Sequence, residues 1–406
     1  MKHKNIYSYG CLVLLASVML FSCKKKDPSV DDYFLNYTIP DVAPTANYTV
    51  GAFYYTSTSW NAAIKYTPTA VGAGGTAAYL STAAGVVPSA LMQAHINAAS
   101  AAKIDYFVFS VRSPNLNNNG YKVDSTIVNS FLTAPNSSKM NFVISYNMET
   151  SNNGITNTGN NDANGNPRGT PLEANAAKLE SFYKDFQRLA YFLGKSNYQK
   201  INGKWLLIFN HAQDLNSNMD PNNPGSTAPV YAEIRKRLSA LGFDLYIIGE
   251  QDNWSSPDNY YYRYQNAVDA VYEANMSDYR AQGLLDRRYL FGPVCDQNFA
   301  YWKKELELWP AGGLTPGQKK LEFVPCIEAG YNYQITNSTN AFVSITRDAT
   351  GSFYRTFTNI AKRNASASNL VLIDSFNNFQ VDTQIEPTNE YGTLYMDITK
   401  QEFKLN

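Results

Sequence analysis

Six polar side chains lie close together in one short stretch of the sequence, residues 374–390. They follow the apolar run Leu370–Ile373, which is typical of a strand buried on both faces, and they are Asn377, Asn378, Gln380, Asp382, Gln384 and Glu386. The hydroxyl groups of sugars both donate and accept hydrogen bonds, and amides and carboxylates meet them at fixed geometry. The stretch therefore indicates a carbohydrate site, with an ordinary polar loop after a strand as the alternative.

The same stretch resembles the signature of glycoside hydrolase family 99 and of the related family 71/99-like and WbsX-type proteins. Residues 375–377 (SFN) and 383–387 (TQIEP) match that signature. Weaker similarity covers residues 93–110 and 201–210, so the resemblance touches most of the chain. It implies a (β/α)8 barrel and an α-linked polysaccharide, such as a mannan, as the substrate.

Between the two matching parts the sequence departs from the family pattern. The positions of the two family glutamates hold Asn378 and Val381, while Phe379, Gln380 and Asp382 replace Trp, His and Gly. In the resembled family one glutamate is thought to deprotonate the 2-hydroxyl of the sugar and the other to protonate the leaving oxygen. Asn378 and Val381 cannot do this chemistry, so the usual catalytic pair is missing.

Three other carboxyl groups are candidates for catalysis. Glu250 and Glu328 each end an apolar run, where partial desolvation raises the pKa of a carboxyl group and suits a general acid. Asp382 is one position beyond the lost family acid. Since glycoside hydrolysis normally uses two carboxyl groups, we expect Asp382 to act with either Glu328 or Glu250. A barrel that binds glycan and no longer cuts it is the alternative.

Eight apolar or aromatic runs alternate with helical patterns along the chain. Such runs are expected of parallel strands covered on both sides, and eight of them with helices between predict one (β/α)8 barrel over residues 47–406. The runs are residues 48–54, 104–111, 141–147, 204–210, 243–250, 268–273, 322–328 and 370–376.

Function in such a barrel lies at the carboxyl ends of the strands. Five further residues at or just after those ends are therefore predicted to bind the sugar, through amide hydrogen bonds or through ring stacking. They are Asn147, Asn210, Tyr272, Trp60 and Trp254. For the two tryptophans, packing beneath a loop is the alternative.

Start and stop signals mark the helices. Residues 170–173 (TPLE) predict a capping box with proline at the first helical position, followed by an apolar stripe that ends at Gly194. A second stripe ends at Gly242, and residues 88–103 predict a third helix. Two polar stretches, residues 152–169 and 214–225, are expected to be long loops. The first only faintly resembles a calcium-binding loop.

The N-terminus has the pattern of a lipoprotein signal over residues 1–22, with a basic start, a short apolar core and a lipobox-like end before Cys23. An ordinary signal peptide is the alternative. The apolar core is too short for a permanent membrane span. We therefore expect lipid at Cys23, a polar tether over residues 23–46, and a location in the cell envelope, at the outer membrane.

Composition excludes some classes of function. The formal net charge is +0, which gives no nucleic-acid footprint, and three histidines do not suggest a His/Cys metal cluster. No cofactor is expected. Cys295 and Cys326 could form a disulfide or could simply be buried. The first hypothesis is a glycoside hydrolase-like lipoprotein acting on an α-linked polysaccharide or oligosaccharide; the alternative is a non-catalytic glycan-binding protein on a degenerate barrel.

Overall fold

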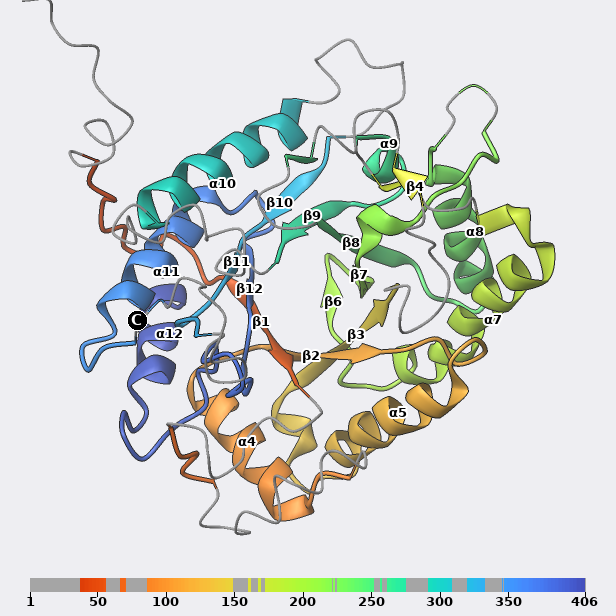
Figure 1. Cartoon of the computed structure of the whole chain (residues 1–406). Helices are drawn as coiled ribbons and strands as arrows, with labels where there is room; N and C mark the ends of the chain where they lie inside the picture. The colour runs from red at the N-terminus through yellow and green to blue at the C-terminus, as the bar shows by residue number, and fades with distance from the viewer. Residues whose placement is uncertain are drawn as a thin grey trace, which may run out of the picture. The chain divides into compact units, whose positions relative to one another are not determined.

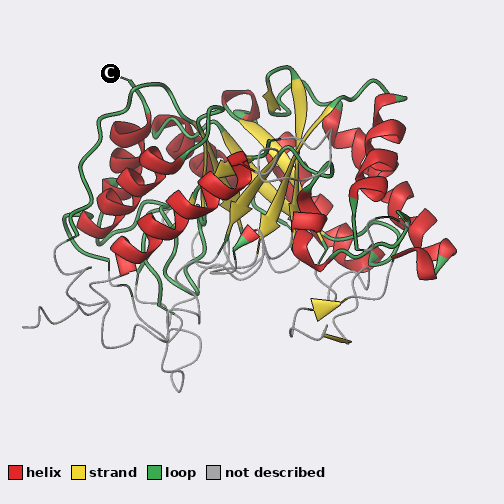
Figure 2. Cartoon of the chain, turned by 90° about the horizontal axis from the view of Figure 1, so that it is seen from above, coloured by secondary structure: helices red, strands yellow, loops and turns green. Residues whose placement is uncertain are grey.

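The computed structural model describes residues 37–55, 66–70, 86–148, 160–161, 167–168, 172–220, 222, 225–251, 256–257, 261–274, 291–308, 320–332, 345 and 347–405. Residues Ile39–Asn406 form one compact unit. Figure 1 shows a ring of strands, viewed along its axis, with helices outside it. Figure 2 shows the same strands from the side, between the helices. The predicted (β/α)8 barrel is therefore confirmed.

Parallel strands form the barrel wall, and neighbouring strands pair in chain order. Seven of them are β1 (Thr49–Tyr54), β2 (Tyr106–Val111), β3 (Asn141–Asn147), β7 (Lys204–Asn210), β8 (Leu245–Gln251), β9 (Ala270–Glu273) and β12 (Leu370–Ile373). A short strand, β6 (Lys200–Ile201), pairs antiparallel with β7. All eight predicted runs contribute to this one sheet.

Pro325 divides the remaining run into two short strands, β10 (Glu322–Val324) and β11 (Cys326–Ile327). Proline has no N–H group to donate to a sheet, so it interrupts the ladder. β10 pairs with β9 and β11 pairs with β12, and the N–H of Leu372 donates to the carbonyl of Pro325 (2.9 Å). The run therefore connects the two ends of the sheet, and the barrel is nearly closed.

Helices follow the strands and cover the outside of the barrel. They are α4 (Ser89–Ala101), α5 (Asn118–Leu132), α7 (Ala176–Leu193), α8 (Ala228–Ser239), the short α9 (Tyr261–Tyr264), α10 (Phe291–Leu308), α11 (Ser352–Asn364) and α12 (Leu394–Phe403). Single 3-10 turns lie at Ser137–Lys139 (η2), Leu172–Ala174 (η3) and Ala212–Asp214 (η4). None of the helices in the described ranges has both the length and the apolar character needed to cross a bilayer.

Residues 170–173 were predicted to begin a helix with a capping box, and this predicted helix start was wrong. Leu172–Ala174 form the separate turn η3, and α7 begins at Ala176. Asn175 caps α7, because its side chain accepts a hydrogen bond from the N–H of Lys178 (3.0 Å). The loop predicted over residues 152–169 also contains two short antiparallel strands, β4 (Asn160–Asn161) and β5 (Pro167–Arg168).

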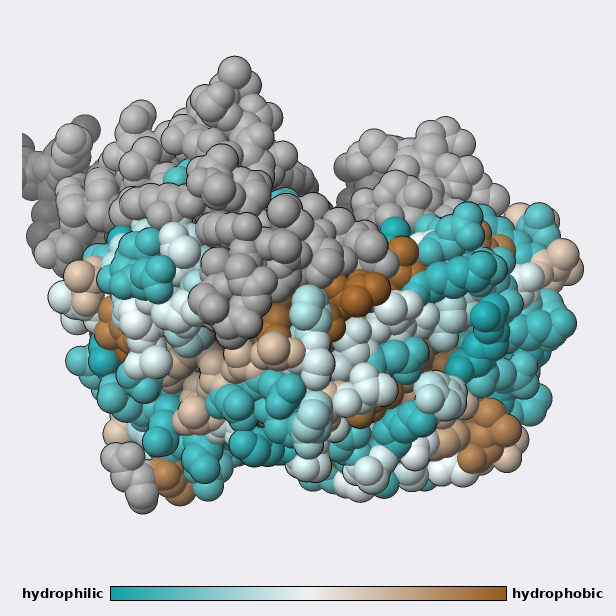
Figure 3. All heavy atoms as spheres, turned by 90° about the horizontal axis from the view of Figure 1, so that it is seen from below, coloured by the Kyte–Doolittle hydropathy of each residue, from teal (hydrophilic) through white to brown (hydrophobic). Residues whose placement is uncertain are grey.

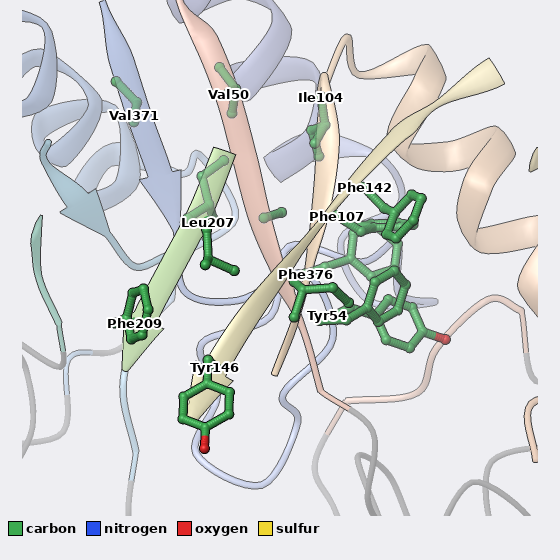
Figure 4. Close-up of a cluster of buried hydrophobic side chains, with 14 of the residues drawn as sticks. Val50, Tyr54, Ile104, Phe107, Phe142, Tyr146, Leu207, Phe209, Val371 and Phe376 are labelled. Carbon is green, nitrogen blue, oxygen red and sulfur yellow. The ribbon is translucent and has the colours of Figure 1, made fainter. Parts of the chain in front are cut away.

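Two hydrophobic clusters separate the outside of the strands from the inside. The outer cluster packs strands against helices; Figure 4 shows Tyr54, Phe107 and Phe376 gathered in it. The ring centroids of Phe107 and Phe376 are 4.8 Å apart. Phe376 thus anchors the polar segment after β12 to the core.

The inner cluster fills the barrel with side chains from alternate strand positions. Tyr106 of β2 lies there beside its register partner Gly51 of β1, where a Cβ would come within 2.3 Å of the Tyr106 ring. Glycine therefore makes room for the ring. On the outer surface, Figure 3 shows hydrophobic residues in small areas among hydrophilic ones over the described part of one face.

Candidate functional site

A cavity of about 220 Å³ lies at the carboxyl ends of the barrel strands. Strands from both sides of the barrel supply its polar wall, which includes Tyr55, Asn147, Asn210, Glu250, Tyr272 and Asp374. The volume is below the about 300–1,000 Å³ that encloses a drug-sized ligand. Its size therefore suits one sugar ring.

Strand alternation explains why these side chains meet. Ile208, Ile248 and Ala270 belong to the cluster inside the barrel. Residues two positions later on the same strands point the same way, and they are Asn210, Glu250 and Tyr272. The register pairs Asn147 with Asn210 and Glu250 with Tyr272. The inner face of the barrel thus changes from apolar to polar at its carboxyl end.

Glu250 is buried and held by two donors. The Oε2 atom of Glu250 accepts a hydrogen bond from the hydroxyl of Tyr272 (2.9 Å) and another from the backbone N–H of His211 (3.0 Å). Burial raises the pKa of Tyr272 well above its ordinary value, so its hydroxyl keeps its proton as a donor. Two donors to one oxygen fix the orientation of the carboxyl group.

Asp374 is the second carboxyl group of the cavity. Burial raises its pKa to about 7, a hydrogen bond from Tyr55 lowers it, and the charge of Glu250 adds to the increase. The Oδ2 atom of Asp374 lies 3.3 Å from the Tyr55 hydroxyl, and its buried Oδ1 atom has no hydrogen-bond partner among the described residues. Near neutral pH this carboxyl group can therefore hold a proton and release it.

Two amides complete the polar wall. Asn210 Oδ1 lies within hydrogen-bonding distance of the Ser145 hydroxyl and 3.1 Å from the Tyr272 hydroxyl, which fixes the amide plane. Asn147 lies beside Asn210 in the register. Both side chains line the cavity and can meet sugar hydroxyls in either hydrogen-bonding sense.

Of the predicted site residues, the structure brings four together in this cavity: Asn147, Asn210, Glu250 and Tyr272. Sequence reasoning did not propose Asp374 as a catalytic group. It follows the apolar run Leu370–Ile373 directly, and this is the same signal that selected Glu250 and Glu328.

The other polar residues of segment 374–390 are absent from the described lining of this cavity. Asn377 instead holds the backbone of Tyr55 with two hydrogen bonds, from the Tyr55 N–H to Oδ1 (2.8 Å) and from Nδ2 to the Tyr55 carbonyl (3.1 Å). Asn378 accepts from the N–H of Gln380 (3.3 Å), and Gln384 donates to Asp382 (3.2 Å). These hydrogen bonds, within the segment and to Tyr55 after β1, fix the conformation of segment 374–390.

Asp382 lies in a buried ion pair. Its Oδ1 atom is 3.5 Å from Nη1 of Arg347, whose side chain is fully buried. The guanidinium group of Arg347 also lies 3.9 Å from the ring centroid of Tyr395 and donates to the carbonyl of Gln384. The Asp382 carboxyl group is therefore engaged by Arg347, and it is absent from the described lining of the cavity.

Glu386 and Glu328 are also buried, and neither is in the described lining of the cavity. Glu386 Oε1 is 3.1 Å from Nε2 of His95, and Nδ1 of His95 is 2.8 Å from the Tyr54 hydroxyl. This chain links α4 to the outer side of β1. After burial, the charge of Glu328 adds to the increase in the pKa of the Cys295 thiol in α10 and of the Cys326 thiol in β11.

Both remaining cysteines are free and buried, so the disulfide alternative does not apply. Burial raises the pKa of each thiol well above its ordinary value and keeps it protonated. Trp60, Trp254 and the lipidation residue Cys23 lie outside the described residues. Within the described ranges, no group of three or more His, Cys, Asp or Glu side chains is arranged to hold a metal ion.

Comparison with known proteins supports the fold. No protein-family model and no curated protein matches the chain. Among solved structures, a glycoside hydrolase-like protein is 27% identical with a TM-score of 0.72, over 93% of this chain and 99% of the other. The GH99 endo-alpha-mannosidase from Bacteroides thetaiotaomicron is 14% identical with a TM-score of 0.55, over 88% and 97%. The chain has a glycoside hydrolase-like TIM-barrel fold.

Proposed function

We propose that this protein is a glycoside hydrolase that cleaves an α-linked polysaccharide or oligosaccharide, with Asp374 as the general acid and Glu250 as the second carboxyl group. The observation that carries the proposal is the contrast between two carboxyl groups in one cavity. Glu250 is held by two donors, whereas burial raises the pKa of Asp374 to about 7. Environments that separate two carboxyl groups in this way are typical of an acid and its partner.

The reaction balances with these two groups and one water molecule. The proton of Asp374 passes to the glycosidic oxygen, and the bond between that oxygen and the anomeric carbon breaks with its electron pair on the oxygen. With Glu250 as a base, water loses a proton to Glu250 and its oxygen bonds to the anomeric carbon. Solvent then returns a proton from Glu250 to Asp374. With Glu250 as a nucleophile, a covalent intermediate precedes the water.

The substrate class rests on three supports. The cavity joins amides to aromatic rings, a combination that suits a sugar. Segment 374–390 resembles the family 99 signature. A solved structure with a similar fold is an endo-alpha-mannosidase, and we therefore propose a mannan-type glycan as the first substrate to test.

Incubation with α-linked manno-oligosaccharides and a wider α-glycan panel tests the proposal. We expect reducing ends to be released, and ¹H NMR of the first product to show one anomer. Inversion of configuration assigns Glu250 as the base that activates water, whereas retention assigns it either as the nucleophile or as the base that deprotonates the 2-hydroxyl of the sugar. Turnover that is unaffected by loss of both carboxyl groups would refute this assignment of the site.

A non-catalytic glycan-binding protein is the second candidate. The observation in its favour is that Asn378 and Val381 stand where the resembled family has its glutamates. Calorimetric binding to the same glycans, with no product after prolonged incubation at pH 5 to 7, would support this candidate over the hydrolase.

The proposed location is the cell envelope, with lipid at Cys23 as the anchor. Replacement of that residue, Cys23→Ser, is expected to release the protein into the soluble fraction of cells that process lipoproteins. A Cys23→Ser protein that stays with the membranes would contradict the anchor.

A further inference from the structure

Tyr55 lies between the first strand and the acid of the cavity. It follows β1 directly, and its hydroxyl is 3.3 Å from Oδ2 of Asp374. The residue as a whole is 36% exposed, whereas Asp374 is 6% exposed. Burial of the hydroxyl and the charge of Asp374 raise the pKa of Tyr55 well above its ordinary value. The hydroxyl is therefore a permanent donor at neutral pH.

The segment that carries the acid also fixes this tyrosine. Asn377, three residues after Asp374, makes the two hydrogen bonds to the backbone of Tyr55. The N–H of Phe376 donates to the carbonyl of Phe53 (2.8 Å). These contacts hold the backbone after β1 and the backbone after β12 in one arrangement, which places the Tyr55 side chain within reach of Asp374.

No other described residue donates a hydrogen bond to the Asp374 side chain. Glu250 carries its own donors, from Tyr272 and from the backbone of His211. Glu250 and Asp374 thus each accept a hydrogen bond from one tyrosine. The tyrosine of Glu250 acts together with a backbone donor, while the tyrosine of Asp374 acts alone among the described residues.

We propose that Tyr55 is a positioning residue for Asp374, which keeps Oδ2 in place and stabilises the negative charge left there when the proton moves to the leaving oxygen. This proposal rests on the proposed hydrolase function. The O–H bond of Asp374 breaks as the O–H bond of the leaving sugar forms, and Asp374 becomes a carboxylate. The hydrogen bond from Tyr55 is stronger to that carboxylate than to the protonated group, so it favours the transfer.

The test removes one oxygen atom and keeps the ring, in Tyr55→Phe. Because Tyr55 stabilises the carboxylate, its loss should raise the pKa of Asp374 by about 0.5–1 pH unit. The alkaline limb of the pH profile of kcat/KM should move to higher pH by the same amount, and kcat should fall about tenfold. If Tyr55 acts only through packing, Tyr55→Phe should lower kcat but leave the alkaline limb of the pH profile at the same pH.

Tyr246→Phe is the matched control. Tyr246 also donates to a carboxyl group, Oε2 of Glu322 (2.9 Å), but it lies at the other end of the barrel, and it does not line the cavity. We expect this variant to leave both the limb and kcat unchanged.

A ¹³C NMR titration of labelled aspartate carboxyl groups reads the pKa of Asp374 without any substrate, with Asp374→Asn used to assign the signal. A higher pKa in Tyr55→Phe than in the wild type supports the proposal, and an unchanged pKa overturns it. If the pKa rises but the wild-type protein cleaves no glycan, the hydrogen bond is correct and the proposed hydrolase function fails.

Discussion

Glu250 of β8 and Asp374 at the end of β12 line the same cavity, and the charge of Glu250 adds to the burial that raises the pKa of Asp374. Glu250 has two donors on one oxygen, whereas Asp374 has a single longer hydrogen bond from Tyr55. The two carboxyl groups thus differ in environment although both are buried. This difference is the basis for proposing Asp374 as the acid and Glu250 as the second carboxyl group.

Substitution of the two cavity carboxyl groups should abolish most turnover. Loss of a general acid or base usually costs about 10²–10⁴-fold in rate, so we expect Asp374→Asn and Glu250→Gln each to fall in that range. Asp382→Asn should cost less than about tenfold, because Asp382 pairs with Arg347 and is absent from the cavity lining. Initial rates on the best glycan, with glycan affinity measured in parallel, check this.

The same three variants separate this assignment from the one based on sequence alone. There Asp382 was expected to replace the lost family acid. If Asp382→Asn loses about 10²-fold in turnover or more while Asp374→Asn stays active, the acid is Asp382 and the structural assignment fails.

Asp374→Asn should also stabilise the protein, and the gain should depend on pH. Between about pH 4 and pH 7 the unfolded chain has lost this proton while the folded protein keeps it, so the free energy of unfolding of the wild type falls as pH rises. The pKa of Asp374 rises from its ordinary value of 3.8 to about 7 in the folded protein, and this shift limits the change in the free energy of unfolding to about 4 kcal/mol. We expect little stabilisation at pH 4.5 and the full gain at pH 8, measured by urea unfolding.

Asp348→Asn provides a control of opposite sign. Burial raises the pKa of Asp348, but hydrogen bonds from Ser352 and Thr350 outweigh it and lower the pKa below its ordinary value. Its carboxylate therefore stabilises the fold above the unfolded-state pKa, and Asp348→Asn should be destabilising at pH 8. Equal effects of the two substitutions would contradict the burial argument for Asp374.

The barrel could be predicted from the sequence because its strands are continuous apolar runs with helices between them. Strand direction and side-chain alternation then place Asn210, Glu250 and Tyr272 on one face without further information. The division of the run 322–328 at Pro325 was not predicted, since only the pairing of β10 with β9 and of β11 with β12 reveals it.

Segment 374–390 was harder to predict because it has no regular period after Ile373. Asp382 has a positive φ of 62°, and its partner Arg347 is distant in sequence. Glu386 likewise meets His95 from helix α4. Neither contact can be predicted from the spacing of nearby residues. Asp382 and Glu386, which were predicted to belong to the site, have buried partners outside the segment.

Gly51 tests how tightly the inside of the barrel is packed. In Gly51→Ala the new methyl group would lie 2.3 Å from the nearest ring atom of Tyr106, and overpacking of this kind typically costs about 1–3 kcal/mol. We expect a loss of that size in urea unfolding. The double variant Gly51→Ala/Tyr106→Leu should cost less than the sum of its single changes; strict additivity would show that the two residues do not compete for space.

The Arg347–Asp382 pair should hold segment 374–390 in place rather than take part in chemistry. Nε and Nη2 of Arg347 have no hydrogen-bond partner among the described residues, and the guanidinium group contacts Asp382, the Gln384 carbonyl and the rings of Tyr66, Tyr391 and Tyr395. Removing one member of a buried pair costs about 3–5 kcal/mol, and we expect Arg347→Met to lose stability in that range. Asp382→Asn in the Arg347→Met background should cost less than in the wild type, with a coupling of about 0.5–3 kcal/mol. Urea unfolding of the four proteins measures this coupling, and a value of zero would mean that Asp382 does not depend on Arg347.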